Sequence, residues 1–85
     1  MTWRLRIAKL AEKELERSPA KDQGYITAAL AQMKAYPFSG DIVRLKNQPA
    51  TFRRLVGNYR IFFDVYPDTG LVDVVAIKRR TSTTY

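Results

Sequence analysis

The hydrophobic pattern changes its period soon after the start of the chain. Residues 2–7 alternate polar and apolar side chains, and a two-residue period is typical of a β-strand with one buried face. Residues 8–17 are good helix formers, and Ala11 and Leu15 lie four positions apart among charged residues. We therefore predict a first strand over 2–7, followed by a short amphipathic helix over 8–17.

A second helix is predicted beyond the dipeptide Ser18-Pro19. Serine is a favoured N-cap, and proline suits the first helical position because its missing N–H is not needed there. An apolar stripe at helical spacing then consists of Ile26, Leu30 and Met33. We expect this helix to run to about Tyr36, where Pro37 ends it.

The second half of the chain favours β-structure. Apolar-rich runs occupy 52–56, 59–66 and 71–79, with the turn sequences Gly57-Asn58 and Pro67-Asp68-Thr69-Gly70 between them, and 42–46 forms a shorter candidate strand. The predicted fold class is α+β: an N-terminal strand, a two-helix hairpin, and an antiparallel β-meander packed against the helices. Eighty-five residues are enough for a single domain, 1–85, with a small core.

The two predicted turns also assign residues to the faces of the sheet. If Val56 pairs with Tyr59, and Tyr66 with Leu71, one face is nearly all apolar and should pack on the helices. That face contains Phe52, Val56, Tyr59, Ile61, Phe63, Val65, Val72, Val74 and Ala76. The other face contains Arg53, Leu55, Arg60, Phe62, Asp64, Asp73, Val75, Ile77 and Arg79. Arginines from three strands are therefore predicted to converge on one face.

Arg54 does not fit this scheme, because it falls on the apolar face. Its side chain either extends to solvent from an edge strand or is displaced by a β-bulge. We expect residues 52–56 to form an edge strand.

Basic residues are concentrated in the second half of the chain. The formal net charge is +7, and residues 44–60 carry five basic side chains and no acidic one, with Lys78, Arg79 and Arg80 following. Such a surface favours a polyanion or an acidic protein partner. We favour a phosphate-binding surface, with Phe62 and Val75 as an apolar floor for a base, over an ordinary solvated charged face, because clustered like charge is costly without a polyanion.

The missing residue types exclude several kinds of chemistry. The chain has no cysteine and no histidine, so thiolate catalysis, disulfides and the usual zinc sites are excluded, and we expect neither a metal nor another cofactor. No apolar run approaches the length of a membrane span, and the N-terminus lacks the apolar core of a secretory signal. A cytoplasmic protein without membrane contact is expected.

Three motifs together resemble the RelE/ParE toxin superfamily across essentially the whole chain. They are Leu45-Lys46-Asn47-Gln48-Pro49, then the run from Phe52 to Ile61 with Gly57-Asn58-Tyr59-Arg60 at its hairpin, then Val75 to Arg80 with Tyr85 behind it. The resemblance implies a toxin that acts as a metal-independent endoribonuclease on mRNA in the ribosomal A site. It also implies a cognate antitoxin, expected to be small and acidic because the toxin is basic.

The resemblance further implies roles for individual residues. Arg60 and Arg79 would stabilise charge on the phosphate, Arg53 matches the family's first basic strand position, and Tyr85 would be the base or a stacking platform. The residues expected to contact RNA are Lys46, Arg54, Phe62, Lys78 and Arg80.

Two departures from the family pattern leave alternatives open. Leu55 stands where many active members have their second basic residue, and Arg54 stands where they have an apolar one. Either a β-bulge exchanges the roles of these two side chains, or the set of groups that acts as general base is reduced. Tyr85 ends the sequence and is alternatively a frayed terminal residue. The competing functions are a ParE-like inhibitor of DNA gyrase and a non-catalytic RNA- or antitoxin-binding domain.

Overall fold

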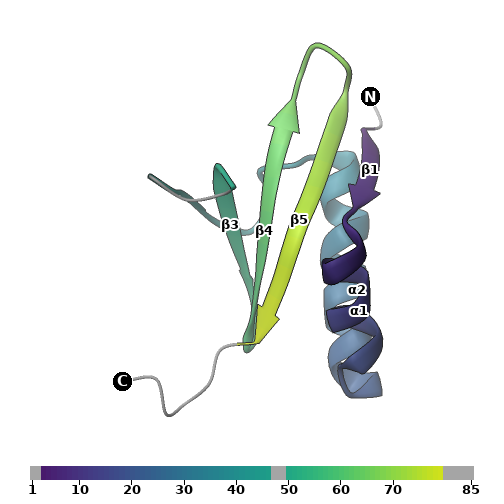
Figure 1. The fold of residues 1–85 in the computed structure, drawn as a ribbon. Helices are drawn as coiled ribbons and strands as arrows, with labels where there is room; N and C mark the ends of the chain where they lie inside the picture. Colours follow the sequence, from purple (N-terminus) through teal and green to yellow (C-terminus); the bar gives the residue numbers. More distant parts are fainter. Residues whose placement is uncertain (1–2, 47–49, 80–85) are drawn as a thin grey trace.

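The computed structural model describes residues 3–46 and 50–79, which form five strands and two helices. The elements in chain order are β1 (Arg4–Ile7), α1 (Lys9–Arg17), α2 (Ala20–Ala35), β2 (Asp41–Arg44), β3 (Phe52–Val56), β4 (Tyr59–Tyr66) and β5 (Leu71–Arg79) (Figure 1). This order confirms the predicted α+β fold, and the bounds of β3, β4 and β5 are those predicted from the sequence. None of the helices among the described residues is long and apolar enough to cross a membrane.

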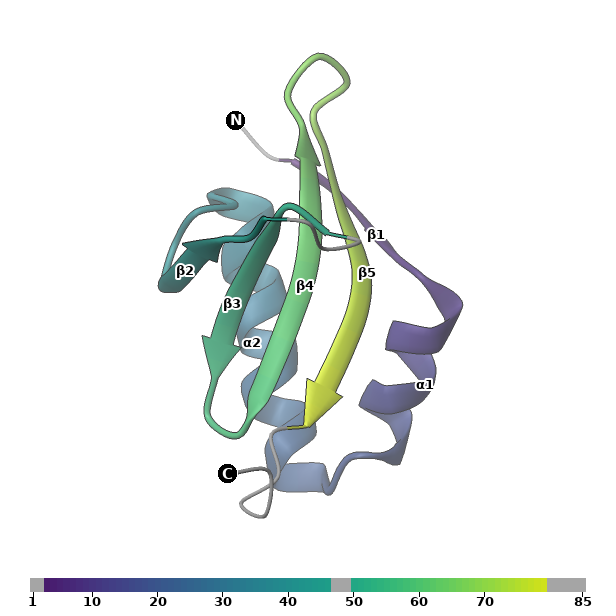
Figure 2. The same ribbon diagram turned by 60° about the vertical axis from the view of Figure 1, so that its left-hand side comes forward.

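The strands form one sheet in the order β1-β5-β4-β3-β2 (Figure 2). β1 pairs with β5 in parallel, whereas the other neighbouring pairs are antiparallel. The first and last strands of the chain are therefore adjacent, and β2 forms the opposite edge. Because β3 lies between β4 and β2, the prediction that residues 52–56 form an edge strand is wrong.

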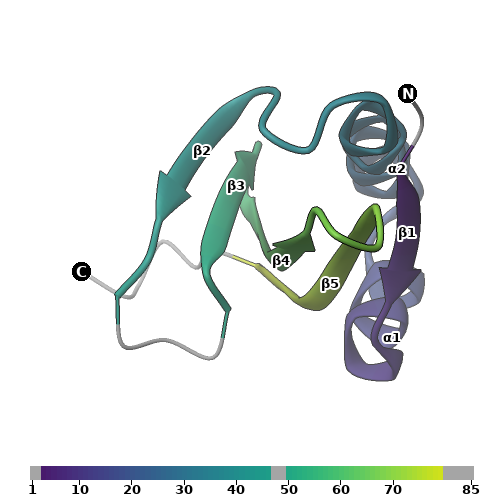
Figure 3. The same cartoon turned by 90° about the horizontal axis from the view of Figure 1, so that it is seen from above.

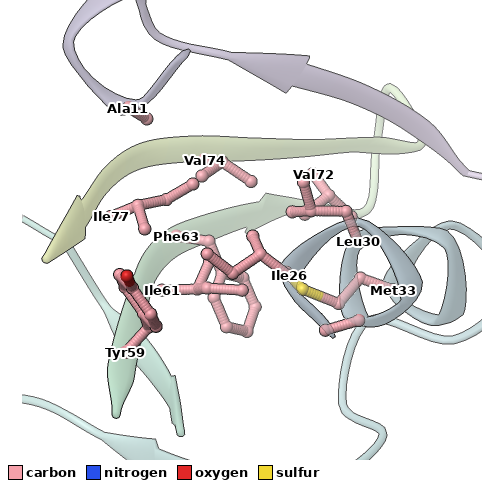
Figure 4. Packing of buried hydrophobic residues seen from close by; sticks show 11 residues of the cluster. Ala11, Ile26, Leu30, Met33, Tyr59, Ile61, Phe63, Val72, Val74 and Ile77 are labelled. Carbon is pink, nitrogen blue, oxygen red and sulfur yellow. The ribbon is translucent and has the colours of Figure 1, made fainter. Parts of the chain in front are cut away.

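α2 lies against one side of the sheet, and α1 lies beside β5 (Figures 2 and 3). We call the other side, which no helix covers, the open face. On the covered side, α2 contributes Ile26, Leu30 and Met33 to the core, and α1 contributes Ala11. These side chains meet Tyr59, Ile61 and Phe63 of β4 and Val72, Val74 and Ile77 of β5 (Figure 4). Each large apolar side chain buried in this way contributes about 1.5–3 kcal/mol of transfer free energy.

A β-bulge in β5 changes the predicted assignment of faces. Phe63 pairs with Val74 but Phe62 pairs with Ala76, so Val75 is an extra residue in β5. From this point Ile77 is opposite Ile61 in the core, where it is 3% exposed, and Ala76 is on the open face. The prediction that Ala76 belongs to the core face was therefore wrong, and burial of the larger isoleucine gives the physical reason for the shifted register.

The link between the helices also differs in detail from the prediction. The hydroxyl of Ser18 donates to the carbonyl of Glu14 at 2.8 Å, so it binds the end of α1 rather than capping α2. Pro19, and not Ser18, is the N-cap residue of α2. The helix break is where we predicted it, but the cap is shifted by one residue.

Candidate nucleic-acid interface

The open face carries cations from three neighbouring strands. In the register of the sheet, Leu55 of β3 pairs with Arg60 of β4, which pairs with Lys78 of β5. In the next row, Arg53 of β3 pairs with Phe62, which in turn pairs with Ala76. Residues on adjacent rows of neighbouring strands lie about 7–8 Å apart, which is within reach of long side chains. The sheet therefore brings Arg53, Arg60 and Lys78 around Phe62.

Phe62 is the aromatic centre of this cluster. Its ring is half-buried, and the ammonium nitrogen of Lys78 lies 5.8 Å from the ring centroid in a cation–π contact. A nucleic-acid base could stack on this ring only if the Lys78 side chain moves aside. Because lysine has a flexible stem, that movement costs little, and it leaves the ammonium free to contact a phosphate.

Arg53 and Arg60 are held more firmly than Lys78, because both are half-buried whereas Lys78 is exposed. The Nε of Arg53 is buried and makes no hydrogen bond to any residue within the described ranges. A guanidinium with its stem packed in the sheet presents its outer N–H groups in a fixed direction, which suits phosphate oxygens.

Carboxylates limit the basic surface on the side of the Pro67–Gly70 turn. Asp64 and Asp73 pair with each other across β4 and β5 on the open face. Asp73 accepts a hydrogen bond from Arg6 of β1 at 2.9 Å, so the positive charge of Arg6 is neutralised within the fold. The cationic region therefore lies toward the Gly57-Asn58 turn and not over the whole open face.

Asp64 also fixes the connection between β2 and β3. Its Oδ1 accepts a hydrogen bond from the backbone N–H of Thr51 at 2.7 Å, and the N–H of Leu45 donates to the carbonyl of Thr51 at 2.7 Å. These bonds join Leu45 and Thr51 to each other and to β4, and the exposed Lys46 follows Leu45 directly. The RNA contact predicted for Lys46 stays a prediction.

The structure corrects the placement of Arg79. Because of the bulge at Val75, Arg79 is opposite Tyr59, whose side chain lies in the core, and so Arg79 is on the helix-facing side of the sheet. The predicted convergence of Arg53, Arg60 and Arg79 on one face is therefore wrong. Lys78 occupies the position on the open face that we had assigned to Arg79.

The structure also corrects the placement of Arg54. This residue is 7% exposed on the helix-facing side, so it does not belong to the open face as an RNA contact. Its Nη1 donates to the carbonyl of Ala29 at 3.3 Å and to Ser39 Oγ at 3.1 Å, and its Nη2 donates to Gln32 Oε1 at 2.5 Å. Burial lowers the pKa of the Arg54 guanidinium below its ordinary value. The exchange of roles between Arg54 and Leu55 that we had considered does not occur, because Leu55 remains on the open face.

Arg80 and Tyr85 lie outside the described residues, so the roles predicted for them stay predictions. The bulge that places Lys78 on the open face was not predicted, because the four consecutive apolar residues from Val74 to Ile77 are compatible with either register. In the part of the chain that the structure covers, no group of three or more carboxylates is arranged to hold a metal ion.

Comparison with known proteins places this fold among bacterial and archaeal toxins. A chain of the archaeal RelE–RelB complex from Pyrococcus horikoshii OT3 superposes with a TM-score of 0.82 at 20% identity, covering 98% of this chain and 100% of that one. A chain of the toxin–antitoxin complex RelBE2 from Mycobacterium tuberculosis gives 0.80 at 17% identity, covering 94% and 100%. The isolated E. coli RelE toxin gives 0.77 at 15% identity, covering 96% and 88%.

At these identities the solved structures show the common fold alone. A search of curated proteins gave no match. The family model described as the ParE toxin of the type II toxin–antitoxin system parDE matches residues 5–83, which is nearly the whole chain. This chain therefore belongs to the ParE toxin family of type II toxin–antitoxin systems, within the RelE/ParE superfamily.

Proposed function

We propose that this toxin is a cytoplasmic, metal-independent endoribonuclease that cuts mRNA in the ribosomal A site and so inhibits translation. The observation that carries the proposal is the cluster of Arg53, Arg60 and Lys78 around Phe62 on the open face. The cluster combines fixed arginines, a mobile lysine and an aromatic ring. This is the combination that phosphate binding and base stacking require.

The proposed reaction is attack of a ribose 2′-hydroxyl on the adjacent phosphate. The new 2′-oxygen–phosphorus bond forms as the bond to the 5′-oxygen breaks, which leaves a cyclic phosphate and a free 5′-hydroxyl. Negative charge accumulates on the non-bridging oxygens, and Arg53 and Arg60 would stabilise it. Lys78 would contact the neighbouring backbone phosphate and is a candidate donor of the proton that the leaving oxygen needs.

The proton of the 2′-hydroxyl also needs an acceptor. Of the carboxylates on the open face, Asp64 accepts the Thr51 N–H and Asp73 is paired with Arg6, so neither is a suitable base. The resemblance to the superfamily makes Tyr85 the proposed base, since a positive site lowers the pKa of a nearby tyrosine. A Tyr85→Phe variant should therefore bind RNA normally and lose cleavage.

The decisive experiment compares two adjacent cations of β5. Translating ribosomes are programmed with a defined mRNA, and cleavage within codons is followed by primer extension. We expect Lys78→Gln and Arg60→Gln to reduce the cleavage rate by about 10–1,000-fold, as loss of a charge-stabilising group does. Arg79→Gln is the matched control, because it removes the same charge from the other face, and it should change the rate by less than about threefold. If Arg79→Gln abolishes cleavage and Lys78→Gln does not, the proposed site is wrong.

We also propose that a cognate antitoxin, small and acidic, neutralises this toxin. The similar solved structures include the RelE–RelB complex from Pyrococcus horikoshii and the toxin–antitoxin complex RelBE2 from Mycobacterium tuberculosis, and the net charge of +7 favours an acidic partner. If the reading frame beside the toxin gene encodes a short acidic protein, its co-expression should restore growth.

Inhibition of DNA gyrase is the second candidate function, because the matching family model is that of ParE and the described part of the open face offers no free general base. A supercoiling assay with purified gyrase separates the two. Inhibited supercoiling with intact mRNA would establish the gyrase function. RNA binding without cleavage or gyrase inhibition would establish a non-catalytic domain.

A further inference from the structure

A groove lies between α1 and β5 at the edge of the sheet. β1 pairs with β5 over residues 71–74, and within the described ranges the rest of β5 has no neighbouring strand on that side. Instead, α1 lies beside it (Figure 2). The groove has a volume of about 250 Å³. One wall consists of Leu10, Lys13, Glu14 and Arg17 of α1, and the other consists of Ala76, Ile77 and Lys78 of β5.

The wall formed by α1 is a second face of this helix. Its four residues are spaced at i, i+3, i+4 and i+7, so they form one stripe along the helix. The core takes its contacts from other positions of α1, Ala11 and Leu15. Leu10 is 76% exposed, whereas Ile77 across the groove is 3% exposed. The groove therefore offers apolar contacts from both walls to a ligand that enters from solvent.

The groove is also cationic. Lys13, Arg17 and Lys78 line it, and Glu14 is the acidic residue among them. In the part of the chain that the structure describes, the one ion pair within 4.0 Å joins Arg6 and Asp73, so no carboxylate neutralises the three cations of the groove. A concentration of like charge of this kind favours an anionic ligand.

The groove is continuous with the cationic cluster of the open face. Lys78 belongs to both, since it lines the groove and its ammonium nitrogen lies 5.8 Å from the ring centroid of Phe62. Ala76, which also lines the groove, is directly opposite Phe62 in the sheet. An RNA strand with one base on Phe62 would therefore carry its neighbouring nucleotide to the entrance of the groove.

We propose that this groove is a second nucleotide subsite, which binds the nucleotide adjacent to the one stacked on Phe62. The base would pack between Leu10 and Ile77, and Lys13 and Arg17 would contact its phosphate. The volume is below the roughly 300–1,000 Å³ of pockets for drug-sized ligands, so it suits one planar base. The inference rests on the proposed binding of RNA to the open face and adds a subsite to it.

Glu14 favours a nucleotide over an acidic peptide as the occupant. Its carboxylate would repel the side chains of an acidic peptide, and it is half-buried in the wall of the groove. The same carboxylate can accept a hydrogen bond from the amino group of a base. The phosphate would remain at the rim, where Lys13 and Arg17 are exposed.

The test uses the full chain labelled with ¹⁵N and a 2′-O-methyl tetranucleotide of adenosine, which cannot be cleaved by 2′-hydroxyl attack. Two further tetranucleotides lack the base at the 5′ end or at the 3′ end. The intact probe should shift the amide signals of Leu10, Arg17 and Ala76 together with that of Phe62. One of the two abasic probes should lose the shifts of Leu10 and Arg17, keep that of Phe62, and bind at least about fivefold more weakly.

Three variants locate the subsite. Arg17→Gln should reduce the slope of log affinity against log salt concentration by about 0.7, the value for one phosphate contact of a single strand. Lys34→Gln is the matched control, because it removes an exposed charge near the end of α2, away from the groove, and it should change that slope by less than about 0.2. Leu10→Ala should weaken binding by about threefold or more without changing the slope, and the exposure of Leu10 means that the fold tolerates the change.

Shifts confined to the open face, equal affinity of all three probes, or an unchanged salt slope in Arg17→Gln would overturn the proposal. A peptide of alternating glutamate and glycine is tested in parallel. If the peptide shifts the signals of Leu10 and Arg17 and the tetranucleotide does not, the groove binds protein and the assignment to RNA is wrong.

Failure of this inference is distinguishable from failure of the proposed function. Cleavage of mRNA on ribosomes by a toxin whose groove signals do not respond to RNA would refute the subsite alone. Occupation of the groove by the tetranucleotide, without cleavage on ribosomes, would refute the nuclease function and leave the subsite in place.

Discussion

Gly40 and Arg54 form a steric pair whose energetic coupling can be measured. Gly40 has a φ of +86°, a conformation that residues with a Cβ rarely adopt. A Cβ at this position would lie 2.7 Å from Arg54 Nε and 2.8 Å from Arg54 Cζ. Gly40→Ala therefore has two separate costs, one from the backbone conformation and one from displacement of the guanidinium.

The magnitudes follow from the contacts of Arg54. The positive φ costs an alanine about 1–2 kcal/mol. Moving the guanidinium weakens its bonds to Gln32 and Ser39, and a hydrogen bond to a charged group contributes about 1.5–3 kcal/mol. Gly40→Ala should therefore lower the free energy of unfolding by about 3–5 kcal/mol in the wild-type background.

Arg54→Met removes the second cost. Methionine is flexible and has no guanidinium for the new Cβ to displace. The loss of the hydrogen bonds to Gln32 and Ser39 is common to both Arg54→Met proteins, so it cancels when the cost of Gly40→Ala is compared between the two backgrounds. In the Arg54→Met background, Gly40→Ala should cost only about 1–2 kcal/mol, the conformational part. The coupling energy between the two sites is then about 2–3 kcal/mol, as observed for residues in direct contact.

The assay is urea unfolding of the wild type, both single variants and the double variant, followed by far-UV circular dichroism. Equal costs of Gly40→Ala in the two backgrounds, within about 0.5 kcal/mol, would refute the steric reasoning. A cost of Gly40→Ala below about 1 kcal/mol in the wild type would refute both parts.

Three further variants test other contacts of the fold. Tyr59→Phe removes the hydrogen bond from the buried Tyr59 hydroxyl to Asp22 at 3.1 Å and should cost about 0.5–1.5 kcal/mol in urea unfolding, without changing RNA affinity. Asp64→Ala leaves the N–H of Thr51 without its acceptor, so it should cost about 1–3 kcal/mol and accelerate hydrogen exchange of that amide; unchanged exchange would contradict the contact. Ile77→Ala should cost about 2–5 kcal/mol because Ile77 lies in the core, whereas a cost below about 1 kcal/mol would argue against the bulged register of β5.

The parts of the fold that depend on residues close together in the sequence were predictable from the sequence. Alternation of apolar and polar side chains defines the strands, and Gly57-Asn58 supplies the positive φ that a two-residue turn needs, with Gly57 at +57°. Because these signals act over a few residues, they placed β3, β4 and β5 to the residue. They also placed Arg53, Arg60 and Phe62 on one face.

The residue that completes the site and the environment of Arg54 were decided only in the tertiary structure. The four consecutive apolar residues from Val74 to Ile77 permit either register, and the choice depends on which side chain is best buried in the core. The resulting bulge at Val75 places Lys78, and not Arg79, on the open face. Arg54 looked like an edge residue because its acceptors lie 15 to 25 positions away in the chain. Contacts at that separation leave no periodic signal in the sequence, so only packing of α2 against β3 shows where this charge is held.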